Sequence, residues 1–173
     1  MKLEERIRAI PDFPIQGIMF RDIAPLLESP EGLREAVERM SAHWEARGIV
    51  KVAAMEARGF VFGAAIALRL GAGFVLVRKP GKLPFRTRSI SYNLEYRSDV
   101  LHIHEDAIHP GDRVLVVDDL LATGGTAKAV VDLVEQLGGI VEGISVLIEL
   151  TGLQGRQRLP GREIRSEIIF EGD

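Results

Sequence analysis

The chain has 173 residues, a mass of 19.1 kDa and a formal net charge of −3, with no cysteine and four histidines. This length suits one domain that buries a sizeable hydrophobic core. The lack of cysteine excludes disulfides, thiolate metal sites and cysteine nucleophiles, and the negative charge disfavours nucleic-acid binding through bulk charge. The longest apolar stretch, 60–68, is too short to cross a bilayer, and the charged start is not typical of a signal peptide. We therefore expect a soluble, cytoplasmic protein with one domain, 1–173.

Hydrophobic spacing then predicts helices and strands in alternation. Ser29 and the proline after it are typical of a helix start, and the apolar face that follows reaches Trp44, with Gly48 as the expected end. A second helix is expected over 60–70 and a third over 127–137. Short apolar runs predict strands over 51–55, 74–77, 114–117, 144–150 and 167–170. Strands that alternate with helices indicate an α/β fold, in which a parallel sheet is flanked by helices.

One segment, 78–88, departs from this alternation. It contains two prolines, one glycine, no acid and five cations, namely Arg78, Lys79, Lys82, Arg86 and Arg88. Alternating residues resume over 89–93 and 100–105, which predicts the two strands of a projecting hairpin. Long loops inside compact domains are usually functional, so the segment is a functional candidate, with a solvated charge run as the alternative. His102 and His104 alternate in the hairpin without an evident third ligand, which favours outward-facing positions over a metal site.

The most informative segment is 114–126. A buried strand ends in two carboxylates, and a loop of small and hydroxyl-bearing residues then leads directly into a helix. Ligands bind beyond the carboxyl ends of parallel strands, and a helix start offers unpaired N–H groups to a phosphate. Gly124 and Gly125 allow close approach, and the hydroxyl groups of Thr123 and Thr126 can donate hydrogen bonds. The pattern predicts a phosphate-monoester site, with an ordinary strand–turn–helix that is capped by a threonine as the alternative.

Two further groups of charged residues lie at the expected carboxyl ends of strands. Asp118 and Asp119 would repel a phosphate, so we expect them to face ribose hydroxyls or a magnesium ion. Arg58 follows the strand 51–55 and lies beside a helix start, where an arginine suits a polyanion. An ion pair with Glu56 is the alternative for this arginine.

The run 118–126 resembles the motif with which type I phosphoribosyltransferases bind 5-phosphoribosyl-1-pyrophosphate (PRPP). Further stretches, in the family's order and spacing, place the resemblance in its adenine-specific branch: 13–22, 56–60, 78–84, 94–96 and 149–156. The resemblance implies the type I fold, with a small N-terminal hood over about 1–28 and a flexible β-hairpin lid over about 79–105. It also implies a purine salvage reaction of adenine with PRPP that gives AMP and pyrophosphate, a requirement for Mg²⁺, and a homodimer.

The same resemblance assigns roles to individual residues. It places PRPP and AMP binding on Asp118, Asp119, Ala122, Thr123, Gly124, Gly125 and Thr126. It places pyrophosphate binding on Arg58, Arg78, Lys79, Lys82 and Tyr96, with a strained or cis peptide at Glu56–Ala57. Phe20 would stack on adenine, and the other adenine-binding residues are Met19, Arg21 and Leu150. The expected catalytic residues are Glu95, Arg58 and Lys82. No residue is firmly assigned to Mg²⁺, which PRPP would mainly hold, near Asp118 and Asp119.

The sequence leaves alternatives open for Glu95, for Phe20 and for the function. Glu95 is the first acid after the basic segment, and a carboxylate inside a closed lid can accept a proton or steady positive charge on the sugar. An exposed glutamate that pairs with Arg88 or Arg97 is the alternative. For Phe20, packing of the hood on the core is an alternative to stacking on the base. At the level of function, the alternatives are transfer to another purine base and a non-catalytic regulator that binds PRPP or RNA.

Overall fold

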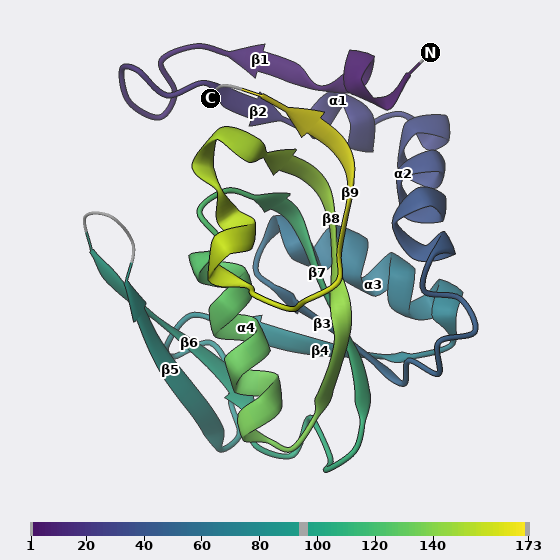
Figure 1. Cartoon of the computed structure of the whole chain (residues 1–173), viewed down its shortest axis with the longest axis vertical. Helices are drawn as coiled ribbons and strands as arrows, with labels where there is room; N and C mark the ends of the chain where they lie inside the picture. Colours follow the sequence, from purple (N-terminus) through teal and green to yellow (C-terminus); the bar gives the residue numbers. More distant parts are fainter. Residues whose placement is uncertain (1, 94–96, 172–173) are drawn as a thin grey trace.

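A mixed β-sheet forms the centre of the molecule (Figure 1). The computed structural model describes residues 2–93 and 97–171, and within them the main sheet has the strand order β5-β6-β4-β3-β7-β8-β9. These strands are β3 (Lys51–Met55), β4 (Gly73–Arg78), β5 (Thr87–Asn93), β6 (Ser98–His104), β7 (Arg113–Leu121), β8 (Ile140–Leu150) and β9 (Ile164–Phe170). The run β4-β3-β7-β8-β9 is parallel, whereas β6 and β5 continue the sheet in the antiparallel sense. The predicted parallel sheet is confirmed for that run.

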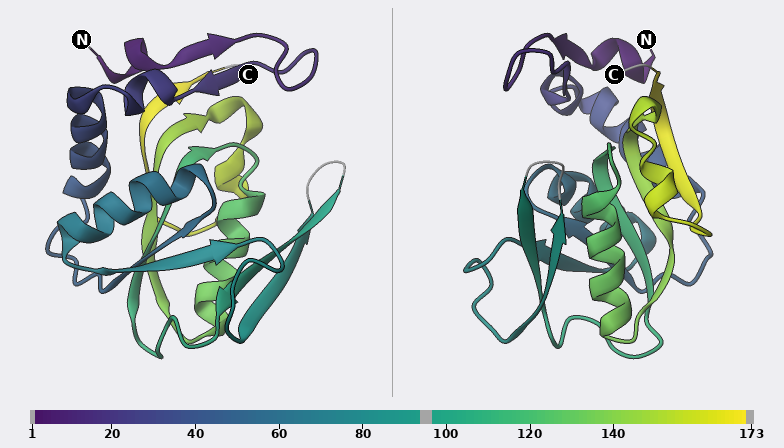
Figure 2. Two further views of the ribbon diagram at one scale, coloured as in Figure 1. Left: turned by 180° about the vertical axis from the view of Figure 1, so that it is seen from behind. Right: turned by 60° about the vertical axis from the view of Figure 1, so that its left-hand side comes forward.

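Helices cover both faces of the sheet, as predicted (Figures 1 and 2). Helix α4 (Gly125–Gln136) lies on one face, and α2 (Pro30–Ala42) and α3 (Arg58–Leu70) lie on the other. The short helix α1 (Ala24–Leu27) precedes α2. None of the described helices has the length and apolar character needed to cross a membrane.

Strand β7 is apolar on both sides because both faces of the sheet are covered. Val114 and Val116 pack into a cluster with α4, while Leu115 and Val117 pack into a second cluster with α2 and α3. None of these four side chains is more than 1% exposed. Continuous apolar runs are typical of strands that are buried on both faces. The run 114–117 therefore predicts this strand correctly although it shows no alternating pattern.

Helix α2 begins as predicted but ends earlier. The Ser29 hydroxyl accepts a hydrogen bond from the Gly32 amide at 3.1 Å, which is the expected N-cap. The helix ends at Ala42 rather than near Gly48. Trp44 is only 1% exposed, but it reaches the core from a turn in which its amide donates to the Ser41 carbonyl at 2.9 Å. The apolar spacing thus predicts correctly that Trp44 is buried, but it does not show that Trp44 is helical.

The N-terminal residues form a unit whose strands the sequence does not predict. The 3₁₀ helix η1 (Leu3–Arg6) precedes β1 (Arg8–Ile10) and β2 (Phe20–Asp22), and the two strands pair as a separate antiparallel sheet. Strands this short carry too little alternation to be recognised. The unit lies across the carboxyl ends of β8 and β9 (Figures 1 and 2). The Arg21 guanidinium stacks there on the Phe170 ring of β9, 3.9 Å from its centroid.

The predicted hairpin is present as β5 and β6, and it continues the edge of the sheet. Two residues of β4, Val77 and Arg78, pair with two residues near the end of β6. On the other strand, Ile90 and Tyr92 pack against the α4 side of the core. The hairpin is therefore joined to the rest of the sheet through backbone pairing and through apolar contacts.

The two histidines of β6 lie on the partly exposed face of the strand. His102 and His104 are partly exposed, whereas Leu101 and Ile103 between and beside them are fully buried, so the histidines occupy the outer face as predicted. The Nδ1 atom of His102 lies 2.9 Å from the Thr87 hydroxyl. Within the described part of the chain, no group of three or more His, Asp or Glu residues could hold a metal ion.

Gly143 of β8 tests how closely the α2 side of the core is packed. A Cβ atom at this position would lie 2.2 Å from Cη2 of Trp44 and 2.9 Å from the Glu163 carbonyl oxygen. We expect Gly143→Ala to lower the free energy of unfolding by about 1–3 kcal/mol, because the core has no room for the methyl group. Urea titration measures this change. Gly73→Ala is the control, since its Cβ would come no closer than 3.4 Å to the flexible Lys51 side chain. Equal stabilities of Gly143→Ala and the wild type would contradict the packing.

Candidate active site

Two loops at neighbouring carboxyl ends of the sheet enclose a cleft of about 410 Å³. Residues 55–59 span the end of β3 and the start of α3, residues 118–127 span the end of β7 and the start of α4, and together they line the cleft. Strands β3 and β7 pair in parallel, so both loops leave the sheet at the same edge. The structure thus brings together Arg58, Asp118, Asp119, Ala122, Thr123, Gly124, Gly125 and Thr126, which the sequence predicts as site residues.

The segment from the end of β7 to the first residues of α4, which we call the phosphate loop (residues 120–126), leaves the start of the helix uncapped by a side chain. The N-cap residue is Gly124, which adopts a left-handed conformation with φ of 83° and has no side chain to occupy the first N–H groups. The alternative of a threonine cap is therefore wrong. Unpaired N–H groups and the positive end of the helix dipole make this position suitable for an anion. Thr126 also forms a side-chain hydrogen bond with Tyr92 of β5.

The acidic pair lies directly beside the phosphate loop. The Asp119 amide donates to Oδ1 of Asp118 at 2.9 Å, and Oδ2 of Asp119 lies 2.9 Å from Nε of Arg58. Burial, together with the neighbouring Asp119 carboxylate, raises the pKa of Asp118 well above its usual range. Arg58 therefore pairs with Asp119 and not with Glu56, which corrects the alternative drawn from the sequence. The arginine opens α3 and faces β7, whereas Glu56 faces β4.

Glu56 holds the first residues of the basic segment at the edge of the cleft. It accepts hydrogen bonds from Nε of Arg78 at 3.2 Å and from the Lys79 amide at 2.8 Å. Burial raises the pKa of Glu56, but the bonds from Lys79 and Arg78 outweigh it, so the pKa is lowered overall and the carboxylate stays charged. The peptide Glu56–Ala57 is cis, as the resemblance implies. The sequence offers Glu56 only as an alternative partner of Arg58, because its actual partners, Arg78 and Lys79, are distant along the chain.

The remaining predicted residues lie beside the cleft or outside the described residues. Nζ of Lys79 is 3.8 Å from Oδ2 of Asp99, and Lys82 is exposed. Arg86, to which the sequence assigns no role, pairs with Glu105 at 2.7 Å. Glu95 and Tyr96 lie outside the described residues.

The predicted adenine-binding residues come from the N-terminal unit and from the end of β8. The Phe20 ring lies 5.2 Å from Cζ of Arg58, which places it next to the cleft. Leu150 is 8% exposed and pairs with Phe170 of β9, on which Arg21 stacks. Met19 is exposed. Arg58 is thus the residue that links this side of the site to the acidic pair.

An ion pair between the buried Glu149 and the half-exposed Arg156 lies at the end of β8, and neither residue was among the predicted site residues. Nε and one terminal nitrogen of Arg156 each donate to Glu149 at 2.7 Å. The Ser166 hydroxyl donates to the same carboxylate at 2.6 Å. The arginine, and to a smaller extent the serine, hold the pKa of Glu149 below its usual range against the effect of burial. Both charged residues lie in the stretch 149–156 that the resemblance quotes, but nothing local in the sequence indicates that they meet.

Comparison with known proteins identifies the family. Residues 25–160 match the family model for the phosphoribosyl transferase domain. The chain is 56% identical to an adenine phosphoribosyltransferase of Symbiobacterium thermophilum, over 98% of this chain and 100% of that one. The chain belongs to the adenine phosphoribosyltransferase family. The resemblance seen in the sequence is thereby confirmed along almost the whole chain.

Solved structures of family members agree with this assignment. The crystal structure of adenine phosphoribosyltransferase from Thermoanaerobacter pseudethanolicus has a TM-score of 0.94 and 54% sequence identity, and the match covers 98% of this chain and 100% of that one. The adenine phosphoribosyltransferase of Saccharomyces cerevisiae, complexed with adenine and an imino-altritol bisphosphate, has a TM-score of 0.91 and 37% identity. That match covers 95% of this chain and 96% of the yeast chain.

The Glu149–Arg156 pair predicts how stability depends on pH. Because the pKa of Glu149 is lowered on folding, its contribution is fully present above the usual value of 4.5 and is lost as the pH falls through the folded-state pKa. We expect the difference in unfolding free energy between the wild type and Glu149→Gln to be largest near neutral pH and to shrink below pH 4.5. Urea titrations between neutral pH and about pH 3 measure it.

The control for this pH series is Glu35→Gln. Glu35 pairs with Arg39 on the exposed side of α2, and such surface pairs contribute little at any pH. A stability difference for Glu149→Gln that is the same at every pH would contradict the prediction.

Proposed function

We propose that this chain transfers the 5-phosphoribosyl group of PRPP to adenine, with formation of AMP and release of pyrophosphate. The uncapped start of α4 beside the acidic pair is the observation that carries the proposal. An anion site and two carboxylates at one edge of a sheet suit a ligand that combines a phosphate with ribose hydroxyls. Relatives that bear the name of this activity match the chain over nearly its full length, which supports the choice of reaction.

In this proposal the phosphate loop binds the 5-phosphate of PRPP and of AMP. Backbone N–H groups from Ala122 to Gly125 and the hydroxyls of Thr123 and Thr126 supply the hydrogen bonds. Asp118 and Asp119 face the ribose hydroxyls. Arg58 keeps the Asp119 carboxylate oriented through their contact at 2.9 Å. Each role follows from chemistry, since N–H and O–H groups donate to a phosphate and carboxylates accept from hydroxyls.

The pyrophosphate of PRPP lies on the other side of the cleft. Arg58, Arg78, Lys79 and Lys82 provide positive charge for it, and the hydroxyl of Tyr96 donates a hydrogen bond. Glu56 keeps Arg78 and the Lys79 backbone at the rim of the cleft. Departing negative charge is stabilised best by groups that are already in place when the bond breaks.

Magnesium is the proposed cofactor. The carboxylate oxygens of Asp118 and Asp119 are suitable ligands for Mg²⁺, but Oδ2 of Asp119 already contacts Arg58. The ion would therefore be held mainly by oxygens of PRPP near this pair. When bound, it neutralises part of the charge on pyrophosphate.

Adenine enters from the side of the N-terminal unit. Phe20 stacks on one face of the ring and Leu150 covers the other, while the backbone of Met19 and Arg21 reads the polar edge. The bond from ribose C1 to pyrophosphate breaks with its electron pair on the leaving group, and N9 of adenine forms the new bond to C1. Adenine loses a proton in the process, for which Glu95 is the proposed acceptor. The hairpin excludes water while this happens.

The reaction is tested by incubating the protein with radiolabelled adenine, PRPP and Mg²⁺. We expect AMP from adenine and little product from hypoxanthine, guanine or xanthine. Product from another base in preference to adenine would support a different purine specificity. Binding of PRPP without turnover of any base would support the regulator instead.

We also propose a cytoplasmic homodimer, which is what the family resemblance supports. Light scattering tests the assembly directly. The expected mass is twice the 19.1 kDa of one chain, and a mass of one chain at assay concentrations would contradict it.

Replacing both acids of the pair tests their contact with the sugar. We expect Asp118→Asn combined with Asp119→Asn to raise the KM for PRPP by roughly tenfold or more, and to raise the KM for adenine less, because only PRPP carries the ribose. Steady-state kinetics with each substrate varied measures this. Asp132→Asn, which removes an exposed carboxylate paired with Lys128 on α4, is the control. An effect confined to adenine would refute the assignment.

Thr126→Val tests the phosphate loop itself. The variant keeps the shape of the side chain and removes the hydroxyl. We expect it to weaken the binding of both AMP and PRPP by roughly 1 kcal/mol or more, because one charge-assisted hydrogen bond is lost. Calorimetric titration with AMP measures the change, with Thr87→Val as a control in β5. Unchanged AMP affinity would count against the site.

Glu95→Gln tests the proton acceptor. We expect kcat to fall by about 10-fold to 1000-fold, with modest changes in both KM values. Single-turnover measurements are preferable, because slow AMP release can mask a slower chemical step. Wild-type single-turnover rates across the pH range would remove Glu95 from the mechanism.

A further inference from the structure

The turn that follows β8 packs directly against the phosphate loop. This backing turn (residues 151–158) consists of η2 (Thr151–Leu153) and η3 (Gly155–Arg158). A Cβ atom on Gly124 would lie 2.4 Å from the Gly155 carbonyl oxygen, and a Cβ on Gly155 would lie 2.4 Å from the Ala122 carbonyl oxygen. Atoms cannot approach so closely, so neither position has room for a side chain. The phosphate loop therefore packs directly against the backbone of the backing turn.

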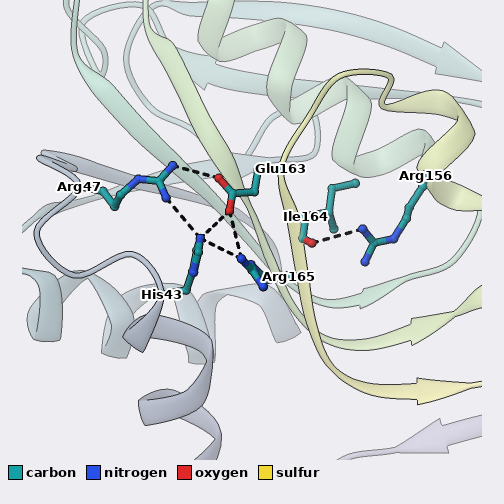
Figure 3. A network of polar contacts seen from close by, with 6 residues as sticks. All are labelled: His43, Arg47, Arg156, Glu163, Ile164 and Arg165. Atoms are coloured by element: carbon teal, nitrogen blue, oxygen red, sulfur yellow. Dashed lines mark hydrogen bonds and ion pairs between the residues drawn. The ribbon is translucent and has the colours of Figure 1, made fainter.

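An ion pair between the buried Glu149 and the half-exposed Arg156, which we call the clamp, fixes the position of the backing turn. Glu149, the residue before the last of β8, is 4% exposed and receives both donors of Arg156 at 2.7 Å. The arginine is also tied to β9. Its other terminal nitrogen donates to the Ile164 carbonyl at 3.3 Å (Figure 3), and the terminal nitrogen that contacts Glu149 lies 3.3 Å from the Ser166 hydroxyl. A two-point contact with a carboxylate fixes orientation as well as distance. Because Arg156 is the neighbour of Gly155, the clamp determines where Gly155 lies.

The strand that receives the clamp is itself anchored. Glu163, just before β9, contacts His43, and it accepts a hydrogen bond from Arg47 at 2.9 Å (Figure 3). These contacts tie the start of β9 to the segment after α2. The Ile164 carbonyl, which Arg156 meets, is the next group along the chain. The β9 groups that Arg156 meets are therefore held by contacts outside the phosphate loop.

The backbone just before Gly155 is restrained as well. Gln154 adopts φ of 55°, an uncommon conformation for a residue with a side chain. Its amide donates to the Thr151 carbonyl at 3.1 Å, and its carbonyl accepts from the Gln157 amide at 3.0 Å. Such a conformation persists only where the surroundings impose it. These two backbone bonds restrain the turn directly before Gly155 and Arg156.

We propose that Glu149 and Arg156 are positioning residues for the phosphate site. They hold Gly155 against residues 122–124, and so keep the N–H groups at the start of α4 directed at the 5-phosphate of PRPP or AMP. The inference rests on the proposed function. Backbone groups bind an anion well only when their geometry is set beforehand. A looser clamp should thus lower the affinity for ligands that carry the phosphate. It should leave the affinity for adenine unchanged, because Leu150 is held separately by its pairing with Phe170.

The first test is Arg156→Lys, which keeps the positive charge and removes the two-point contact. We expect the Kd for AMP, measured by calorimetric titration, and the KM for PRPP to rise by about fivefold or more, while the KM for adenine changes by less than about twofold. The matched control is Arg162→Lys. Arg162 pairs with Glu135 at 2.6 Å in the same return segment, but at the far end of α4 from the phosphate loop. It should leave all three constants unchanged.

A second variant, Gly155→Ala, changes the contact between the backing turn and the phosphate loop and leaves both residues of the ion pair in place. Its methyl group would press on the Ala122 carbonyl, so AMP affinity should fall by about fivefold or more here too. If Arg156→Lys does not fold, as judged by thermal unfolding, Gly155→Ala decides the question. Unchanged AMP affinity in the folded variants would overturn the positioning role. The proposed function would still stand in that case, provided that the wild type binds AMP. An equal rise in the KM for adenine would also overturn it. A wild type that does not bind AMP would overturn both proposals.

Discussion

The parallel pairing of β3 with β7 determines where every other part of the site can lie. Ala54 pairs with Val117 near the end of β3, so the last residues of β7, from Asp118 on, lie beside the segment that follows β3. This arrangement allows Arg58 to reach Asp119 at 2.9 Å. The pairing depends in turn on burial, since β7 places apolar side chains against α4 on one face and against α2 and α3 on the other. The chemistry of the site is thus a consequence of how the centre of the sheet is covered.

The charges at this edge are arranged as partners within the protein. Asp119 orients Arg58, and Glu56 orients Arg78 and the Lys79 backbone. Long cationic side chains lose rotamer freedom when they bind an anion, and that cost is smaller when they are already held. The carboxylates thereby keep the cations close to their working positions. The start of α4 differs, because there backbone N–H groups face the cleft and no side chain of the N-cap residue competes with a ligand.

The features that could be predicted from the sequence are those encoded within a short stretch. The run from Asp118 to Thr126 contains the strand end, the loop and the helix start in direct succession, so its geometry follows from local rules. The partner of Arg58 does not, because it depends on which strand lies alongside. The end of α2 at Ala42 and the strands β1 and β2 were missed for a related reason, since burial from a turn imitates a helical face and three-residue strands show no period. The contact of Gly155 with Gly124 joins residues far apart in the sequence, and no local pattern reports it.

The central claim is that the phosphate loop recognises the 5-phosphate. The most direct measurement compares the calorimetric Kd values of AMP and adenosine for the wild-type protein, because the two ligands share base and sugar and differ only in the phosphate. Several charge-assisted hydrogen bonds from the loop should make AMP bind about 100-fold more tightly than adenosine, or better. Equal affinities for the two ligands would contradict the account.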